Sequence, residues 1–289
     1  KQYRIGYLMI APFMIMFFIF TIIPVAASLL LSFTSYNMIQ MPKFIFMQNY
    51  IQLFLTDELF IIALKNTMIF AIATGPGSYF ISLITAWFLN ELSPRARSIV
   101  TFIFYAPSIS GNAMLVWTLA FSGDSYGYVN GWLMKLGIIS EPILWFTNTK
   151  YIMPLCIVVS LWMSLGTSFL AFIAGFQGIN HDMYEAAAID GIKNRWQELW
   201  YVTLPSMKPQ LMFGAVMAIT GAFNFGGVVE SLAGNPTTDY CAYTLTMHLN
   251  EYSGVRWEVG YASAIAFIMF LLMFGSNMLI HKLLSKVGQ

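Results

Sequence analysis

The chain has 289 residues, of which 58% are hydrophobic, 17% aromatic and only 9% charged, and its formal net charge is +1. Soluble domains carry about 25% charged residues, so this chain has too few charges to cover a water-facing surface. The near-neutral charge also excludes a nucleic-acid-binding or disordered chain. The composition therefore predicts an integral membrane protein.

Six stretches without Lys, Arg, Asp or Glu are long enough to cross a bilayer, which takes about 20 apolar residues. Each stretch should be helical, because lipid offers no partner to unpaired backbone groups. We therefore expect an all-α protein whose residues 1–289 form a single transmembrane domain. Its predicted spans are 7–33, 62–89, 98–121, 152–176, 207–230 and 260–282. The first stretch exceeds signal-peptide length and lacks a small-residue cleavage site, so it should be a retained helix.

The positions of Lys and Arg predict the orientation. Six spans put both termini on the same side as the segments 90–97 and 177–208. That side holds nine of the 14 basic residues, namely Lys1, Arg4, Arg95, Arg97, Lys193, Arg195, Lys208, Lys282 and Lys286. Basic residues concentrate in cytoplasmic loops, so both termini should be cytoplasmic. The outer loops 34–61, 122–151 and 231–259 either cap the bundle or dock a partner, and loop statistics favour capping.

One outer loop and one inner loop are each predicted to contain a short helix. Residues 130–138 are typical of a short helix lying at the membrane interface. On the inner side, Asp182 suits an N-cap and Glu185 suits the third helical position, which together form a capping box. Ala186 to Ala188 favour helix, and Gly191 should end it.

A second short helix is expected to follow Gly191 and run to Thr203, and Pro205 should begin the next span. The product is a stubby helix outside the membrane with a small alanine face. One interpretation is a capped surface helix between two spans. The other is a peg that fits a groove on a cytoplasmic partner, since small residues let backbones approach closely.

This segment, residues 182–205, resembles the EAA loop of permease subunits in bacterial binding-protein-dependent ABC importers. That pattern is Glu-Ala-Ala, three residues, Gly, nine residues, a hydrophobic residue, any residue and Leu-Pro. The chain matches with Glu185-Ala186-Ala187, Gly191 and Leu204-Pro205. It has ten residues rather than nine between Gly191 and Val202, so it carries a one-residue insertion.

The resemblance covers nearly the whole chain and is closest to the MalF-type subunit of carbohydrate importers. It is carried in order by Ala11-Pro12, Ile23-Pro24, Leu31 to Asn37, Asn49-Tyr50, Asn66-Thr67, Trp162, Gly175 to Gln177, Ala233 to Pro236 and Gly260 to Ala264. It implies a type I ABC importer permease fold in a bacterial inner (cytoplasmic) membrane.

The resemblance also implies partners. The coupling element that docks in a cytoplasmic ATPase would comprise Glu185, Ala186, Ala187, Asp190, Gly191, Leu204 and Pro205. The chain lacks the G-x-x-x-x-G-K-[ST] sequence that cradles phosphates, so it should bind no cofactor itself. ATP and Mg²⁺ should instead be bound by a separate ATPase subunit, of which the family uses two copies. A second permease subunit, forming a heterodimer or a homodimer, and a periplasmic solute-binding protein complete the expected assembly.

Spans four and five are the expected substrate path. Asn224 is unfavourable at lipid depth unless it pairs or lines a cavity, and the glycines around it permit a broken helix. The resemblance to the maltose subunit assigns substrate contacts to Ser160, Met163, Ser164, Thr167, Thr220, Phe223, Asn224 and Gly227. The alternative interpretation is that these small polar residues are helix-packing contacts.

The substrate class follows from the resemblance to oligosaccharide and polysaccharide permeases, with alginate a candidate. Another small solute such as glycerol 3-phosphate is the alternative. An enzyme is not expected, because His181, His248 and His281 are scattered, and neither Cys156 nor Cys241 has metal-ligand spacing. A channel or scaffold is a third class, which flux without ATP would favour.

Overall fold

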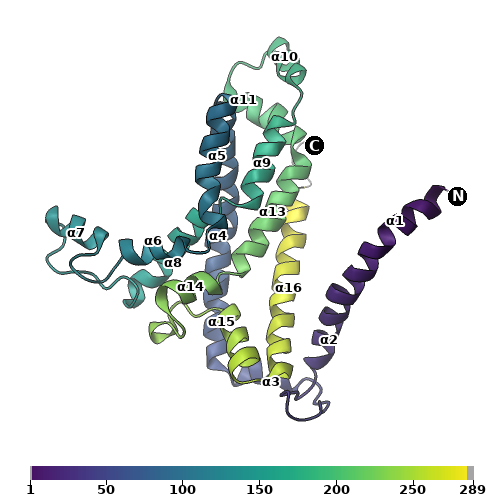
Figure 1. Cartoon of the computed structure of the whole chain (residues 1–289), viewed down its shortest axis with the longest axis vertical. Helices are drawn as coiled ribbons and strands as arrows, with labels where there is room; N and C mark the ends of the chain where they lie inside the picture. The colour runs from purple at the N-terminus through teal and green to yellow at the C-terminus, as the bar shows by residue number, and fades with distance from the viewer. Residues whose placement is uncertain (1, 285–289) are drawn as a thin grey trace. The chain divides into compact units, whose positions relative to one another are not determined.

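The structure is a computed structural model that describes residues 2–284, with side chains from residue 6 onward. Lys1 and Lys286, two of the basic residues that predict the orientation, lie outside the described residues. The described part of the chain is helical apart from turns, loops and one isolated antiparallel bridge between Thr34 and Phe44. Four helices are long and apolar enough to cross a membrane, and two bent helix pairs qualify when each pair counts as one span. The all-helical membrane fold is therefore confirmed, with up to six spans (Figure 1).

The chain forms two compact units. Unit 1 combines residues 1–61 with residues 247–272, and unit 2 combines residues 62–246 with residues 273–289. Two long helices, α4 (Glu58–Asn90) and α16 (Val259–Leu284), contribute to both units.

Unit 1 contains the first span and the segments around the start of α4 and α16. Its other helices are α1 (Gln2–Phe17), α2 (Ile23–Leu31), α3 (Gln48–Leu55) and the end of α15 (Leu245–Asn250), with π-helical turns at Phe18–Ile22 and Glu251–Val255. The first π-helical turn ends at Ile22, two residues before Pro24, which has no backbone N–H to donate. The first helix ends at Leu31, two residues before the predicted end.

Buried polar contacts hold the chain after the first span. Asn49 is buried, and its Nδ2 donates to the carbonyl oxygens of Ser32 and Thr34 at 2.7 and 3.0 Å. Gly260 lies so close to this turn that a Cβ atom there would collide with the carbonyl oxygen of Thr34. Only glycine fits at this point, where the Gly260 N–H donates to the Tyr36 carbonyl at 2.9 Å.

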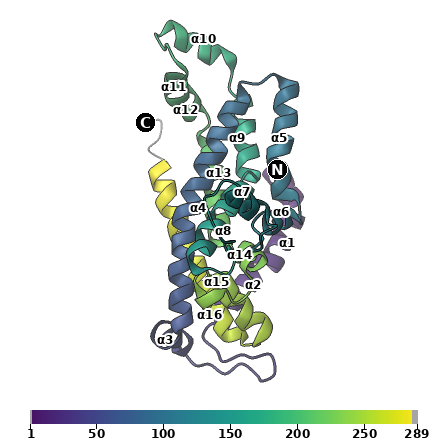
Figure 2. The same ribbon diagram turned by 90° about the vertical axis from the view of Figure 1, so that its left-hand side faces the viewer.

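Unit 2 contains the remaining spans. Its further helices are α5 (Pro94–Ile109), α6 (Ala113–Ala120), α7 (Tyr128–Lys135), α8 (Thr149–Met163), α9 (Thr167–Gln177), α10 (His181–Ile189), α11 (Arg195–Glu198), α12 (Leu204–Ser206), α13 (Lys208–Phe223) and α14 (Gly226–Ala233), with a π-helical turn at Leu199–Thr203 and a 3-10 turn at Thr238–Tyr240. Helices α4, α9 and α13 run side by side (Figures 1 and 2). Their buried side chains, among them Ala86, Phe169, Phe172 and Leu211, form the main apolar core.

The spans are less continuous than predicted. The third span bends by 83° between α5 and α6, so the prediction of one helix over 98–121 is wrong. The bend occurs at Ser110, Gly111 and Asn112, which are weak helix formers. The fourth span starts at Thr149 and is interrupted at residues 164–166.

The entry into the fifth span also differs from the prediction. Pro205 lies inside the short helix α12, and Met207 breaks the helix with φ −93° and ψ 12°. The span therefore begins at Lys208 rather than at Pro205. Farther on, α13 and α14 are bent by 43° at Asn224 and Phe225, which confirms the break predicted there.

Candidate functional site

A cavity of about 240 Å³ lies in unit 2 where the fourth and fifth spans are interrupted. Ser164 and Thr167 come from the break between α8 and α9, and Phe225 comes from the break between α13 and α14. Interrupted membrane helices present backbone and small polar groups at depth, which is how many transporters build their binding sites. The lining contains no Asp, Glu, Lys or Arg.

Hydroxyl groups dominate the polar part of this cavity. Ser78 of α4, Ser160 of α8 and Ser168 of α9 join Ser164 and Thr167 in the lining. Two of these hydroxyls donate to nearby carbonyls: Ser78 Oγ to the Gly75 oxygen at 3.0 Å and Ser164 Oγ to the Leu161 oxygen at 2.6 Å. Ser160 differs, because its Oγ is buried and has no hydrogen-bond partner. A buried unpaired hydroxyl is costly, so this atom is suited to bind a polar group that enters the cavity.

Four of the eight predicted substrate contacts line this cavity, namely Ser160, Met163, Ser164 and Thr167. The other four do not. Thr220, Asn224 and Gly227 lie on the exposed side of α13 and α14, whereas Phe223 is only 4% exposed and packs in the interior. The prediction missed Ser78, whose place beside the fourth span depends on packing between helices that local sequence does not encode.

The predicted coupling segment forms a helix, α10, with a different start. Asn180 is the N-cap, because its side chain accepts a hydrogen bond from the Asp182 N–H at 3.2 Å. The predicted capping box is therefore wrong, since Asp182 and Glu185 lie farther inside the helix. Glu185 is exposed and lies 3.7 Å from His181 Nδ1.

The end of α10 is as predicted. Gly191 has φ +95°, its N–H donates to the Ala188 carbonyl, and the Ile192 N–H donates to the Ala187 carbonyl. These two bonds form a Schellman motif, which requires the left-handed conformation that glycine adopts most readily. The loop is thus closed tightly, with Glu185, Ala186 and Asp190 exposed and Ala187 facing inward.

One contact closes the predicted coupling segment on itself, and two more fasten it to the end of α4. The Tyr184 hydroxyl lies 3.0 Å from Thr203 Oγ1, and burial raises the pKa of Tyr184. Arg195 pairs with Glu91 at 2.6 Å, next to the turn that holds Arg97. The rings of Trp87 and Trp196 lie 4.9 Å apart. The segment and the 90–97 turn therefore occupy the same end of this unit, above a polar cleft of about 740 Å³.

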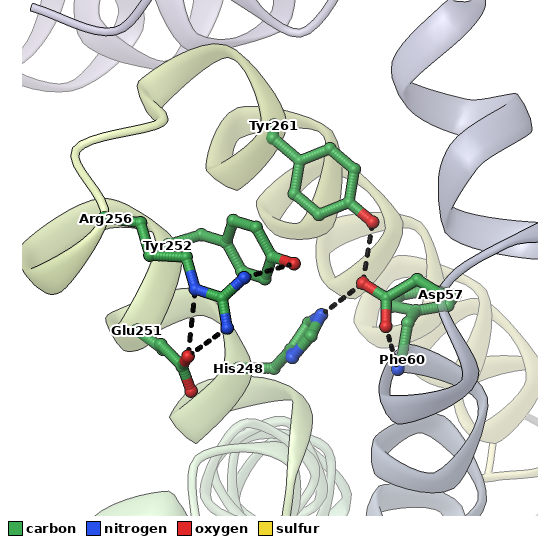
Figure 3. Close-up of polar contacts among 7 residues, drawn as sticks. All are labelled: Asp57, Phe60, His248, Glu251, Tyr252, Arg256 and Tyr261. Carbon is green, nitrogen blue, oxygen red and sulfur yellow. Dashed lines mark hydrogen bonds and ion pairs between the residues drawn. The ribbon is translucent and has the colours of Figure 1, made fainter.

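A separate polar cluster lies in unit 1 (Figure 3). Asp57 caps α4 by accepting from the Phe60 N–H, and its other oxygen contacts His248 Nε2 at 3.0 Å and accepts from the Tyr261 hydroxyl at 2.7 Å. Burial alone would raise the pKa of Asp57, but the hydrogen bonds to His248, Tyr261 and the Phe60 N–H outweigh it and lower the pKa to about 2. Beside the cluster, Arg256 stacks on Tyr252 and pairs with Glu251 (Figure 3).

Neither cysteine forms a disulfide, and Cys156 is buried in α8. Among residues 2–284, no group of three His, Cys, Asp or Glu side chains is placed to hold a metal ion.

Comparison with known proteins assigns the family. A family model described as the inner membrane component of a binding-protein-dependent transport system matches residues 78–288. The chain belongs to this family. The predicted resemblance is thus confirmed, and the chain is a membrane permease component of such a system.

Several relatives match almost end to end. A probable ABC transporter permease, YesP of Bacillus subtilis, is 34% identical and covers 94% of this chain and 88% of its own. The lactose permease LacF of Rhizobium radiobacter is 29% identical over 93% and 90% of the two chains. The arabinooligosaccharide permease AraP of Bacillus subtilis is 28% identical over 92% and 84%.

A solved structure supports the same fold. A chain of a bacterial alginate ABC transporter in complex with an alginate pentasaccharide-bound periplasmic protein superposes with a TM-score of 0.77. It is 25% identical in sequence, and the match covers 100% of this chain and 98% of the other.

Proposed function

We propose that the chain is one of two permease subunits of an ATP-driven importer for oligosaccharides. The observation that carries the proposal is the cavity at the interrupted spans, whose lining offers hydroxyl and apolar groups and no charge. Neutral sugars are bound through hydrogen bonds and apolar contacts, so this lining suits them. The lactose and arabinooligosaccharide permeases among the relatives support the same substrate class.

The size of the cavity supports a two-subunit path. At about 240 Å³ it lies below the range of about 300–1,000 Å³ that is usual for small-molecule pockets. Thr220, Asn224 and Gly227 are exposed on α13 and α14, where a second permease subunit can complete the path. A paralogous partner, and hence a heterodimer, is our proposal for this subunit.

The mechanism we propose is alternating access. A loaded binding protein docks on the outer side, two ATPase subunits close on ATP and Mg²⁺, and their motion displaces α10. The Tyr184–Thr203 contact links α10 to the turn that leads into α13, so the displacement reaches the wall of the cavity. In this scheme residues 1–289 act as one permease domain, residues 182–205 are its coupling segment, and both termini lie in the cytoplasm.

An acidic polysaccharide such as alginate is a second candidate, favoured by the similarity to the alginate transporter chain. The cavity lining of this subunit holds no cation, so a positive contact for alginate would have to come from the second permease, the outer loops or a helix N-terminus. The same requirement applies to a phosphorylated solute such as glycerol 3-phosphate.

The proposal is tested by reconstituting the complete transporter and measuring ATP hydrolysis stimulated by its binding protein. Neutral oligosaccharides, alginate oligomers and glycerol 3-phosphate are supplied in turn. We expect stimulation by a neutral oligosaccharide. Stimulation by alginate oligomers or glycerol 3-phosphate, without stimulation by any neutral oligosaccharide, would show that the substrate is an anionic solute. Solute flux without ATP would refute the importer mechanism.

A further inference from the structure

The break in the fifth span leaves a backbone carbonyl that its own helix cannot pair. Helix α13 ends at Phe223, and Asn224 leaves the helical conformation with φ −106° and ψ 31°. The last carbonyls of a helix have no partner within it, so each needs a donor from elsewhere. The Thr246 hydroxyl donates to the Phe223 carbonyl oxygen at 3.3 Å. A side chain 23 positions farther along the chain therefore supplies a hydrogen bond at the break.

Thr246 also packs against the other side of the break. Helix α14 begins at Gly226, which is buried, and a Cβ atom there would lie 2.7 Å from Thr246 Cβ. Only glycine lets the two segments approach this closely. Thr246 therefore contacts both the last residue of α13 and the first residue of α14.

Helix α4 holds the chain just before this threonine. Asn66 is buried, and its Nδ2 donates to the carbonyl oxygens of Tyr240 and Tyr243, each at 3.0 Å. The Thr67 hydroxyl oxygen accepts from the Leu245 N–H at 2.9 Å. Buried hydrogen bonds of this kind rigidify the groups that they join. The threonine that spans the break is thus carried on a segment with a fixed support.

The same helix also contacts the wall of the cavity. Phe70 is fully buried and lies one turn after Asn66, so the two side chains share one side of α4. The Phe70 ring stacks on that of Phe225, with the ring centroids 5.8 Å apart. Phe225 lines the cavity and directly precedes α14. Its position is therefore determined by the stack on Phe70 and by the geometry of the break.

We propose that Thr246 is a positioning residue for transport, whose hydroxyl holds the fifth span in the broken conformation that places Phe225 in the cavity wall. The inference rests on the proposed function in taking this cavity as the solute site. Thr246 belongs to the loop 231–259, on the side where the binding protein is proposed to dock. A displacement of this loop on docking would therefore reach the break directly.

The test compares Thr246→Val, which removes the hydroxyl and nearly keeps the shape, with Thr246→Ser, which keeps the hydroxyl. Thr118→Val is the matched control, because Thr118 also donates to a carbonyl, that of Leu115 at 3.0 Å, and does not line the cavity. The first measurement is hydrogen–deuterium exchange of residues 224–230 in the complete transporter without solute, which reports local opening. The second is uptake kinetics in proteoliposomes. If Thr246→Val does not fold, Thr246→Ala takes its place.

We expect exchange of residues 224–230 to be several-fold faster in Thr246→Val and unchanged in Thr246→Ser and Thr118→Val. The KM for uptake should rise several-fold in Thr246→Val alone, with a maximal rate close to that of the wild type. Unchanged exchange in Thr246→Val, or the same increase in Thr246→Ser, would overturn the proposal. Faster exchange with an unchanged KM would also overturn it, because the break would then not position the cavity wall.

The inference and the proposed function fail separately. A wild-type transporter that takes up no solute would refute the proposed function. The exchange difference between Thr246→Val and Thr246→Ser would then decide whether the hydroxyl holds the break, since that measurement needs no solute.

Discussion

The carboxylate of Asp57, at the start of α4, accepts a hydrogen bond of 2.7 Å from the hydroxyl of Tyr261, in the first turn of α16. The two residues are 204 positions apart in the chain. His248 contacts the same carboxylate oxygen and is itself almost fully buried. One acidic side chain therefore joins three helices of unit 1 at the point where two long spans begin.

This cluster predicts a defined pH dependence of stability. The folded pKa of Asp57 is lowered from 3.8 to about 2, so the stabilisation is fully present above about pH 4 and is lost as the pH falls toward 2. A shift of this size corresponds to about 2 kcal/mol. Asp57→Asn keeps a side chain able to cap α4 but removes the charge, and should lower the melting temperature at neutral pH.

The control for that prediction is Asp124→Asn, at an exposed loop position. The difference between wild type and Asp57→Asn should shrink as the pH is lowered from 4 to 2.5, as followed by thermal unfolding in detergent. A difference that is the same at both pH values would show that the charge of Asp57 does not contribute.

The end of α10 predicts a loss of coupling without a loss of fold. A Cβ at Gly191 meets no neighbouring atom, so substitution there costs backbone strain only, which is about 1–3 kcal/mol for a non-glycine residue in this region. Gly191→Val should unwind the last turn of α10 and abolish transport and ATPase stimulation, while the chain stays folded with a melting temperature lowered by about 2–4 °C for each kcal/mol of strain. Gly191→Asn, which tolerates positive φ better, is the matched control and should keep most of the activity.

Charge reversal at Glu185 tests the exposed face of the same helix. Glu185 is 74% exposed, and within the described residues its ion pair is with His181 one turn earlier, so Glu185→Lys should not destabilise the chain. If α10 docks in an ATPase, the reversed charge should abolish uptake and ATPase stimulation. Normal uptake by this variant would contradict the coupling role.

Removing the Arg195–Glu91 pair should change the coupling of ATP hydrolysis to transport without changing stability. Both side chains are exposed, at 65% and 42%, and such pairs contribute about 0–1 kcal/mol to stability. Arg195→Ala should therefore leave the melting temperature nearly unchanged, yet increase the ATP hydrolysed per solute transported, because the coupling segment loses its link to the 90–97 turn. The double exchange Arg195→Glu with Glu91→Arg should restore the wild-type ratio of ATP hydrolysed to solute transported. If neither Arg195→Ala nor the double exchange changes this ratio, the pair is not part of the coupling path.

Features set by local chemistry were predictable from the sequence. Lipid demands charge-free helical stretches, so the spans follow from the positions of 27 charges. Gly191 ends α10 because the helix end requires a positive φ, which glycine adopts without steric strain. The start of α10 was less determined, since Asn180 and Asp182 are both good caps and the path of the chain out of α9 selects the first.

Features that depend on how helices pack were not predictable from the sequence. Thr220, Phe223, Asn224 and Gly227 fall on one side of an ideal helix, yet Phe223 is buried and the other three are exposed. The bend at Asn224 and Phe225 and the position of neighbouring helices decide this difference. In the same way, Ser78 lines the cavity because α4 packs against the interrupted fourth span, where Ser82 Oγ lies 3.5 Å from the Ser164 carbonyl oxygen.

Ser160 offers the sharpest test of the cavity. Its buried Oγ has no partner, so Ser160→Ala removes an unsatisfied hydroxyl and should leave stability unchanged or slightly raise it. If a sugar hydroxyl pairs with this atom during transport, the same substitution should raise the KM for uptake several-fold with little change in maximal rate. Thr74→Ala is the control, because Thr74 is equally buried but donates to the Phe70 carbonyl at 2.7 Å and does not line the cavity. Uptake kinetics in proteoliposomes that show equal KM values for wild type and both variants would remove Ser160 from the substrate path.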